Sequence, residues 1–295
     1  MTRRSRRPPR SGNSKGDAAS ADPDQPVLFE LPPSGAVEPL VQPLRHPIWT
    51  EYKARLIERY LYYFVMITKH GTYIDGFAGP QESGRDDMWA ASLVLNSEPR
   101  WLRNFLLFDR DSNAIEQLYQ LEGQQPVKPK RHIGVYRGDF NEEILPILRS
   151  GEIKRKEATF CLLDQRTFEC KWSTLEALAE YKSTKIELFY FLGNLWLDRA
   201  LAAVRDQTIA EWWGRDDWDR LKPMKQPDRM LLLATRFRQE LGYASVKGWP
   251  IMDRRDGGHV MYYMTHATDH LHAPRLMQRA YQRVLRRKEP PEQVR

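Results

Sequence analysis

Cysteine is scarce in this 295-residue chain, which contains only Cys161 and Cys170. Two thiols cannot build a disulfide framework, and they cannot supply the four ligands of a cysteine-only metal site. The sequence also lacks a long apolar run, because its most apolar stretch, Tyr60–Thr68, is far shorter than the roughly 20 residues that a membrane-spanning helix needs. No secretory core follows the N-terminal arginines. These absences predict a soluble cytoplasmic protein with no membrane partner.

Acidic side chains are missing from the first 16 residues, which carry six basic ones, while residues 275–295 carry seven basic and two acidic side chains. The whole chain has 46 basic and 39 acidic side chains, so residues 17–274 keep 33 basic and 37 acidic ones. The positive charge therefore lies at the two ends. Such tails could hold a phosphate backbone without sequence preference, or could simply solubilise the chain. Composition does not predict a basic groove between them.

The predicted domain organisation follows from the same contrast between ends and middle. Residues 1–45 are rich in proline, serine, glycine and arginine and have almost no apolar periodicity, which predicts a disordered tail. Residues 46–285 are long enough for one domain with a large core, and a basic tail, 286–295, follows it. Within the domain, a helix over about 50–68 is expected to cover a sheet, and Lys53 near its start could border a ligand or pack in the core.

Five short apolar runs alternate with stretches of helical pattern along this domain. The alternation predicts an α/β fold in which a parallel sheet is covered on both faces. Two later runs, joined through a glycine turn, predict an antiparallel hairpin. The five runs are Thr72–Ile74, Asn104–Asp111, His132–Phe140, Ala158–Asp164 and Lys185–Leu192, the hairpin strands are Tyr243–Met252 and His259–Met264, and a helical insert is expected over about 205–241.

A loop that contains two glycines follows the first run and indicates a nucleotide pocket. Asp75 stands at the carboxyl tip of the predicted strand, and Gly76 and Gly79 allow the backbone to turn tightly and to approach a ligand. Asp109 ends the next run, where an acid can bind ribose hydroxyls. Asp139 and Asp164 end or follow two further runs. Ligands of such sheets bind at the carboxyl ends of the strands, so these acids are expected to share one site.

The order of these features resembles the class I S-adenosylmethionine-dependent methyltransferase fold, which has a glycine-rich first loop and acids after strands two, three and four. The resemblance implies a Rossmann-like, mostly parallel seven-stranded sheet with an antiparallel terminal hairpin and a helical insert. It also implies S-adenosylmethionine as the cofactor. The residues expected to bind it are Asp75, Gly76, Phe77, Gly79, Asp109, Asp139 and Phe140, and the Phe140 ring could stack on the adenine.

More narrowly, the chain resembles the three-Cys-motif partner family (TcmP), whose members are encoded beside a cysteine-motif, radical-enzyme-like protein. This resemblance covers roughly residues 46–281 and implies that protein as a partner, while leaving the substrate open. The chain departs from many relatives at Gln81, where they have a further glycine, and after Asp164, where they have proline. The segments that carry the resemblance are Tyr73–Pro80, Phe108–Asp109, Gly138–Glu142, Leu163–Asp164, Trp172–Ala179 and Tyr262–His270.

Asp164 and Arg166 are the candidate catalytic residues. Methyl transfer from a sulfonium depends chiefly on positioning the nucleophile, and Asp164 would sit beside the methyl donor. Arg166 stands where amino-methylating relatives of this fold have proline, and its guanidinium suits a phosphate or carboxylate, or forms a salt bridge with a neighbouring acid. Cys170 is a weaker candidate for covalent C5 chemistry on a pyrimidine. No metal site is predicted, because His266, His270 and His272 lack a fourth ligand at helical spacing.

The sequence therefore predicts a methyltransferase-like protein that acts on nucleic acid, DNA or RNA, alongside the three-Cys-motif partner. The alternative is a non-catalytic accessory protein that keeps the fold and binds a nucleotide or nucleic acid for a partner complex. Gln81 and the missing proline frame after Asp164 both favour this alternative. The target base, the oligomeric state and the role of Cys170 are not specified by the sequence.

Overall fold

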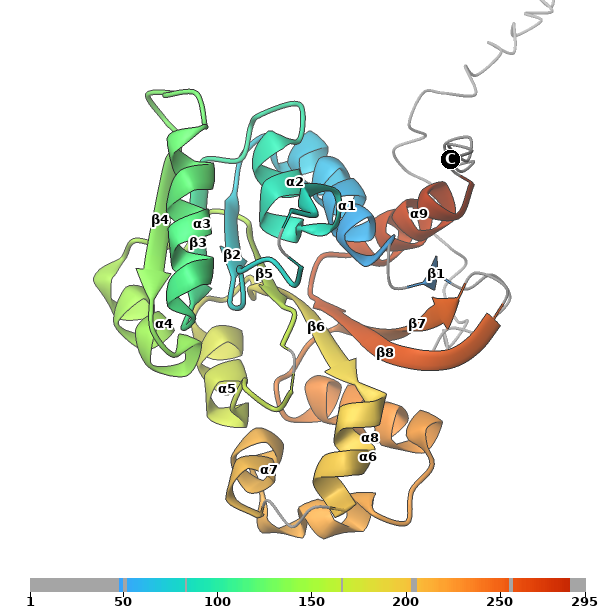
Figure 1. The fold of residues 1–295 in the computed structure, drawn as a ribbon. Coiled ribbons are helices and arrows are strands. Elements are labelled where there is room, and N and C mark those ends of the chain that lie inside the picture. The colour runs from blue at the N-terminus through green and yellow to red at the C-terminus, as the bar shows by residue number, and fades with distance from the viewer. Residues whose placement is uncertain are drawn as a thin grey trace, which may run out of the picture. The chain divides into compact units, whose positions relative to one another are not determined.

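The computed structural model describes residues 48–49, 52–82, 84–165, 167–202, 206–254 and 257–286. The predicted tails, 1–45 and 286–295, lie outside these ranges except for Arg286. Within the described residues the chain forms one sheet of eight strands flanked by helices (Figure 1). The strands are β1 (Ile48–Trp49), β2 (Thr72–Asp75), β3 (Asn104–Asp109), β4 (His132–Arg137), β5 (Thr159–Leu163), β6 (Glu187–Gly193), β7 (Ser245–Arg254) and β8 (Gly257–Thr268).

The strand order is β1-β7-β8-β6-β5-β2-β3-β4. Every neighbouring pair is parallel except the two that involve β8, which runs antiparallel to both β6 and β7. The predicted mostly parallel seven-stranded sheet with an antiparallel terminal hairpin is therefore confirmed. The two-residue β1, which pairs with the outer edge of β7, is an addition that the sequence pattern does not predict.

Two apolar cores form because successive side chains of a strand point to opposite faces of the sheet. In β5, Phe160 and Leu162 face one core, whereas Cys161 and Leu163 face the other. The first core is completed by α1 (Lys53–Thr68), α2 (Ala90–Asn96), α3 (Ser112–Gly123) and α9 (Ala273–Arg286). The second is completed by α4 (Phe140–Ser150), α5 (Trp172–Glu180), α6 (Asn194–Ala202), α7 (Asp206–Trp213) and α8 (Gln226–Gln239). Both faces of the parallel strands are thus covered, as predicted.

The segment between β6 and β7 contains α6, α7, a 3₁₀ turn at Asp216–Leu221 and α8. The last three lie within the predicted helical insert, about 205–241, and α6 precedes it. Two tryptophans of α7 pack inside the protein. Trp212 and Trp213 are buried, and the Arg236 guanidinium lies between the rings of Trp172 and Trp213, at 3.8 and 4.1 Å from their centres. These rings therefore form core, and they do not form a wall for a planar substrate.

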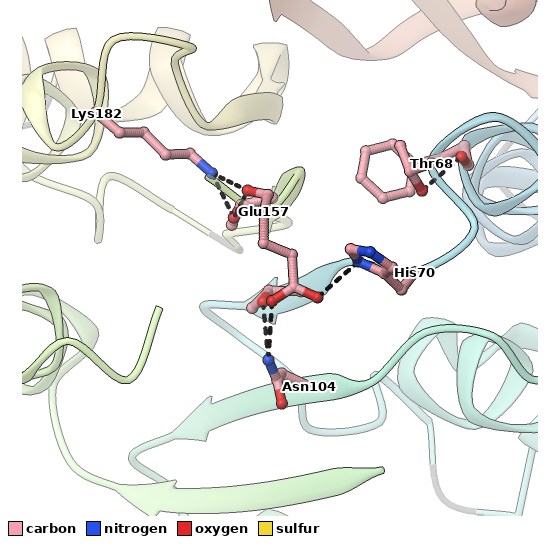
Figure 2. A network of polar contacts seen from close by, with 8 residues as sticks. Thr68, His70, Asn104, Glu157 and Lys182 are labelled. Carbon is pink, nitrogen blue, oxygen red and sulfur yellow. Dashed lines mark hydrogen bonds and ion pairs between the residues drawn. The ribbon is translucent and has the colours of Figure 1, made fainter. Parts of the chain in front are cut away.

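A polar network closes the amino ends of β2, β3 and β5 (Figure 2). The Glu157 carboxylate contacts Nδ1 of His70 at 2.9 Å and accepts a hydrogen bond from Nδ2 of Asn104 at 3.4 Å. Lys182 donates to the main-chain oxygen of Glu157 and to the Thr159 hydroxyl, at 2.5 and 2.6 Å. Burial lowers the pKa of Lys182 to about 8. Because these groups hydrogen-bond to one another, the network stabilises the amino ends of these strands.

Candidate functional site

A cavity of about 670 Å³ opens at the carboxyl ends of β2, β3, β4 and β5. This is the edge at which parallel α/β sheets bind their ligands, and the volume is that of a small-molecule or cofactor site. The loops that follow the four strands all contribute to its wall. Of the sequence-predicted site residues, the cavity brings together Gly76, Phe77, Gly79, Asp109, Asp139, Phe140 and Asp164.

Asp109 forms the best-defined anion in the cavity wall. Its Oδ2 accepts a hydrogen bond from the Gly79 amide at 2.8 Å, and its Oδ1 accepts one from the Asp111 amide at 2.9 Å. A Cβ atom added to Gly79 would lie 2.5 Å from Oδ2, so only glycine allows the loop to approach this closely. Each carboxylate oxygen keeps a second lone pair, which makes Asp109 a suitable acceptor for two hydroxyl groups of a ribose.

Asp75 lies apart from the other predicted acids. Its side chain is 1% exposed and is not part of the wall of the large cavity. Oδ2 accepts a hydrogen bond from the Tyr73 hydroxyl at 2.7 Å, and Oδ1 accepts one from the Phe77 amide at 3.2 Å. Burial raises the pKa of Asp75 to about 7. These contacts give the carboxyl a role in shaping the turn from Asp75 to Phe77.

Asp139 and Phe140 begin α4 on the far side of the cavity. Asp139 caps the helix, since its Oδ1 accepts hydrogen bonds from the amide and from Nδ2 of Asn141, at 2.8 and 2.7 Å. Phe140 lines the cavity but is only 2% exposed, because its ring packs against Phe77 and Phe108. Of these rings, Phe77 is the half-buried one. Phe77 therefore offers more surface to a flat ligand than Phe140 does.

Asp164 is held by two side chains from other parts of the chain. The Lys53 ammonium lies 2.9 Å from Oδ1 and 2.8 Å from Oδ2, and Nε2 of Gln81 donates to Oδ2 at 3.1 Å. Lys53 is 4% exposed and also lies over the rings of Phe191 and Tyr262, at 5.1 and 4.7 Å from their centres. The sequence leaves the role of Lys53 open, and the structure assigns it to the edge of the site.

A second, smaller pocket of about 20 Å³ lies beside the large cavity and continues the site. Phe77, Gly79, Gln81 and Asp164 line both spaces, while Lys53 and Asp75 line only the smaller one. The site is consequently elongated. One end is formed by Asp109 and Asp139, and the other end is formed by the Lys53–Asp164 ion pair.

Ion pairs at the mouth of the cavity were not singled out by the sequence pattern. Arg110 pairs with Glu169 at 2.7 Å, and Lys171 pairs with Glu211 at 2.9 Å. All four residues border the cavity or its rim, and the two pairs join the loops after β3 and β5 and the helix α7. Charged residues in loops are common in any sequence, so only the three-dimensional structure identifies these four.

Several other candidate residues lie away from the site or outside the described ranges. Arg166 falls outside the residues that the structure describes. Cys170 is buried, and burial raises the pKa of its thiol, which disfavours a nucleophilic role. His266 is buried at the opposite end of the sheet, where Nε2 lies 2.6 Å from Glu187. No group of three or more histidine, cysteine, aspartate or glutamate residues suited to a metal ion occurs in the described part of the chain.

Comparisons with known proteins add to this description of the fold. No protein-family model matches the chain, and no curated protein matches it. Among solved structures, the chain is similar to P. horikoshii TYW2 in complex with MeSAdo, with 11% identity and a TM-score of 0.37. That match covers 75% of this chain and 64% of the TYW2 chain, so this chain spans less than two thirds of that structure.

Two further solved structures are similar at comparable levels. One is a proposed methyltransferase from Thermobifida fusca, with 10% identity, a TM-score of 0.42 and coverage of 74% of this chain and 80% of that one. The other is a proposed class I S-adenosylmethionine-dependent methyltransferase from Listeria monocytogenes, with 7% identity, a TM-score of 0.41 and coverage of 83% and 73%. Likenesses of this size carry no argument about activity.

The strand order identifies the fold. Five parallel strands in the order β4-β3-β2-β5-β6 are followed by a reversed β8, which lies between β6 and β7. This is the fold of the class I S-adenosylmethionine-dependent methyltransferases, with the short β1 added at one edge. No helix in the described part of the chain is both long and apolar enough to cross a membrane.

Proposed function

We propose that this protein is an S-adenosylmethionine-dependent methyltransferase that acts on nucleic acid. The observation that carries the proposal is the elongated site at the carboxyl ends of the strands. Asp109, held by the Gly79 amide, forms one end of this site, and the Lys53–Asp164 ion pair forms the other. A nucleoside fits the first end and an amino-acid group fits the second, and S-adenosylmethionine contains both.

The residues of the site fit this cofactor in charge and in shape. Asp109 would hold the ribose hydroxyls, and Asp139 and Phe77 would border the adenine. The backbone of Gly76–Gly79 would approach the middle of the molecule, because Gly79 has no Cβ to keep a ligand away. Lys53, at the second end, provides a positive charge for the carboxylate of the methionine end. When bound, the cofactor supplies a methyl group activated by a sulfonium.

Asp164 is the residue proposed to orient the methyl acceptor. Lys53 and Gln81 contact its oxygens from two sides, so the carboxylate has a fixed direction beside the junction of the two pockets. A fixed carboxylate can accept a hydrogen bond from an N–H or O–H of the acceptor and align its lone pair. Alignment of this kind supplies most of what methyl transfer requires of a protein. Arg166 remains the proposed contact for a phosphate or carboxylate of the substrate.

The proposal also includes a partner. The resemblance of the sequence to the TcmP family supports a complex with a three-Cys-motif, radical-enzyme-like protein, and nucleic acid is the substrate class that the basic chain ends support. A non-catalytic accessory role is the second candidate. It is favoured by one observation, the engagement of both Asp164 oxygens by Lys53 and Gln81, which leaves less of the carboxylate for a substrate.

Transfer of a labelled methyl group tests the proposal. The full-length protein, with and without the candidate partner, is incubated with labelled S-adenosylmethionine and mixed DNA and RNA. Asp164→Asn should retain cofactor affinity in calorimetric titration and lose at least about a hundredfold in turnover, the usual effect of losing a positioned catalytic group. Asp216→Asn, which changes an exposed aspartate outside the site, serves as the matched control.

Two outcomes would decide against catalysis by Asp164. Cofactor binding without transfer to any nucleic acid pool would leave the accessory role as the better account. Activity that survives Asp164→Asn and is lost in Cys170→Ser would favour covalent chemistry at that cysteine, despite its burial.

A further inference from the structure

Helix α9 carries a row of arginines on its outer side. Arg275, Arg279 and Arg283 recur at every fourth residue, which places them within an arc of about 80° on an α-helix. The helix contains no acidic residue. Its opposite side is apolar and buried in the first core, where Met277 and Ala280 are fully covered. The arginine row therefore faces away from the core.

Helix α1 packs beside α9 and extends this row (Figure 1). Arg55, Arg59 and Arg283 line a common shallow pocket, and the Arg279 guanidinium lies 5.9 Å from the centre of the Tyr63 ring. The two helices thus share one surface, formed by Arg55, Arg59, Arg275, Arg279 and Arg283, which we call the arginine face. Glu58 is the single acidic residue that α1 and α9 contain.

The protein neutralises the arginine face only in part: Glu58 lines the same pocket as Arg55, Arg59 and Arg283, and Asp87 interacts with the charge of Arg55. In the described part of the chain, none of its five guanidinium groups forms an ion pair with a carboxylate, whereas those of Arg229 and Arg236 do. Like charges on neighbouring helical turns repel one another. An external anion would remove this cost, and a planar guanidinium is well suited to a phosphate because it can donate two parallel hydrogen bonds.

The position of the arginine face links it to the candidate active site. Helix α1 begins at Lys53, whose ammonium pairs with Asp164, and Arg55 follows two residues later. Because residues two positions apart on a helix point to opposite sides, a strand bound along α1 and α9 would pass around the first turn of α1 to reach the Lys53 end of the site. Half-buried tyrosines also lie among the arginines, with the Arg59 guanidinium 5.3 Å from the centre of the Tyr62 ring. Basic groups interleaved with aromatic rings are typical of surfaces that bind single-stranded nucleic acid.

We infer that the arginine face binds the phosphate backbone of a nucleic acid and delivers it to the site beside Lys53. A membrane fits this surface less well, because an interfacial helix needs an exposed apolar side and that of α9 is buried in the core. The inference deepens the proposed function by naming the surface that holds its substrate, and it rests on that function for the nature of the reaction.

Binding measurements on the full-length protein without cofactor test the inference. Affinity for a labelled 20-nucleotide single-stranded DNA, the matching RNA and the duplex is measured by fluorescence anisotropy at several salt concentrations. The variant Arg275→Gln/Arg279→Gln/Arg283→Gln should bind at least about tenfold more weakly at low salt. The slope of log K against log salt is negative, and each lost phosphate contact makes it less steep by about 0.7 to 0.9. The slope of this variant should therefore be less steep by about 2.

The matched control removes the same charge elsewhere. Arg149, Lys154 and Lys156 are exposed on and after α4, and their replacement by glutamine should leave affinity and salt slope nearly unchanged. Since Arg279 is half-buried, the double variant Arg275→Gln/Arg283→Gln, which changes only exposed side chains, should show a smaller loss in the same direction. Unchanged melting temperatures would exclude misfolding as the cause.

The failure of the inference can be told apart from failure of the proposed methyl transfer. Equal losses of affinity in the α9 variant and the control, or no loss in either, would overturn the inference. Binding would then depend on the net charge or on the basic chain ends. Binding of the arginine face to anionic phospholipid vesicles but not to nucleic acid would also overturn it. A further outcome pairs a selective loss of nucleic-acid binding in the α9 variant with no methyl transfer by the wild-type protein. That pair of results would support the arginine face and reject the proposed reaction.

Discussion

Asp75 and Asp109 end neighbouring strands, yet their carboxyl groups face different surroundings. Asp109 lines the open cavity and is held by two backbone amides. Asp75 is sealed beneath the glycine loop, where the Tyr73 hydroxyl and the Phe77 amide are its partners. Burial raises the pKa of Asp75 to about 7, because a charge away from water is costly even when hydrogen bonds partly compensate. Asp75 therefore differs from an ordinary exposed carboxyl group in its protonation near neutral pH.

This difference predicts an unusual dependence of stability on pH. The pKa of Asp75 rises from 3.8 towards about 7 on folding, so the folded state binds a proton more tightly than the unfolded state does. Its contribution to stability is full below the unfolded pKa and is lost as pH rises to about 7. Asp75→Asn, which imitates the neutral carboxyl, should raise the free energy of unfolding by about 2 to 4 kcal/mol at pH 8 and have little effect near pH 4.

Urea unfolding at pH 4, 6 and 8 measures this effect. The control is Asp216→Asn, because that aspartate is exposed and its replacement should give pH-independent differences close to zero. A variant Asp75→Asn that is no more stable than wild type at pH 8 would show that the carboxyl is ionised in the fold at little cost.

The loop after β2 packs closely against the end of β3 and the start of α3. A Cβ on Gly79 would lie 2.5 Å from Oδ2 of Asp109 and 2.6 Å from Cβ of Ala114, which is in the first turn of α3. The atoms that would have to move belong to a strand end and a helix. Gly79→Ala should therefore lower stability by about 1 to 3 kcal/mol, the usual cost of overpacking, and weaken binding of S-adenosylmethionine more than tenfold.

Gly123→Ala is the matched control for this substitution, because Gly123 ends α3 and a Cβ there meets no atom within 4 Å. Thermal unfolding and calorimetric titration of both variants separate the effect on the fold from the effect on the site. Full cofactor affinity in Gly79→Ala would mean that the loop yields easily and that its close approach to Asp109 is not needed for binding.

Much of the sheet could be predicted from the sequence because its strands are short apolar runs that end in acids. Asp109, Asp139 and Asp164 were expected at one edge for that reason, and they line the same cavity. The two-residue β1 has no periodicity to detect, so it could not be found. The direction in which the Asp75 carboxyl turns depends on a hydrogen bond to Tyr73, which strand patterns do not encode.

The Lys53–Asp164 pair could not be predicted with certainty for a different reason. The two residues are 111 positions apart in the chain, and their contact requires α1 to begin at the carboxyl end of β5. A lysine in the first turn of a helix is usually exposed to solvent, and only tertiary packing against Phe191 and Tyr262 buries this one. Gln81 likewise gains its role from the fold, since the sequence shows it only as a departure from a glycine.

At the scale of the whole molecule, the two ends of the sheet divide structural and binding roles. The amino ends carry the Glu157 and Lys182 network and the buried pair of Glu187 and His266. The carboxyl ends gather loops from sequence-distant segments around an open cavity. Because the glycine loop and the ends of β3 and β5 line that cavity, and α1 lines the smaller pocket beside it, a bound ligand would add contacts between these parts of the domain.

Cofactor binding should consequently stabilise the domain as a unit. At a free S-adenosylmethionine concentration a hundred times its Kd, mass action adds about 2.7 kcal/mol to the free energy of unfolding. For a domain of this size that corresponds to a rise of roughly 5 to 10 °C in Tm.

Circular dichroism should show one shifted transition, and Asp109→Ala should lose most of the shift while Asp216→Asn keeps it. Adenosine alone should give a smaller shift, because it lacks the carboxylate that Lys53 would hold. A shift equal for adenosine and S-adenosylmethionine would restrict the site to a nucleoside, and no shift with either would remove the methyl donor from the cavity and leave the accessory role ahead.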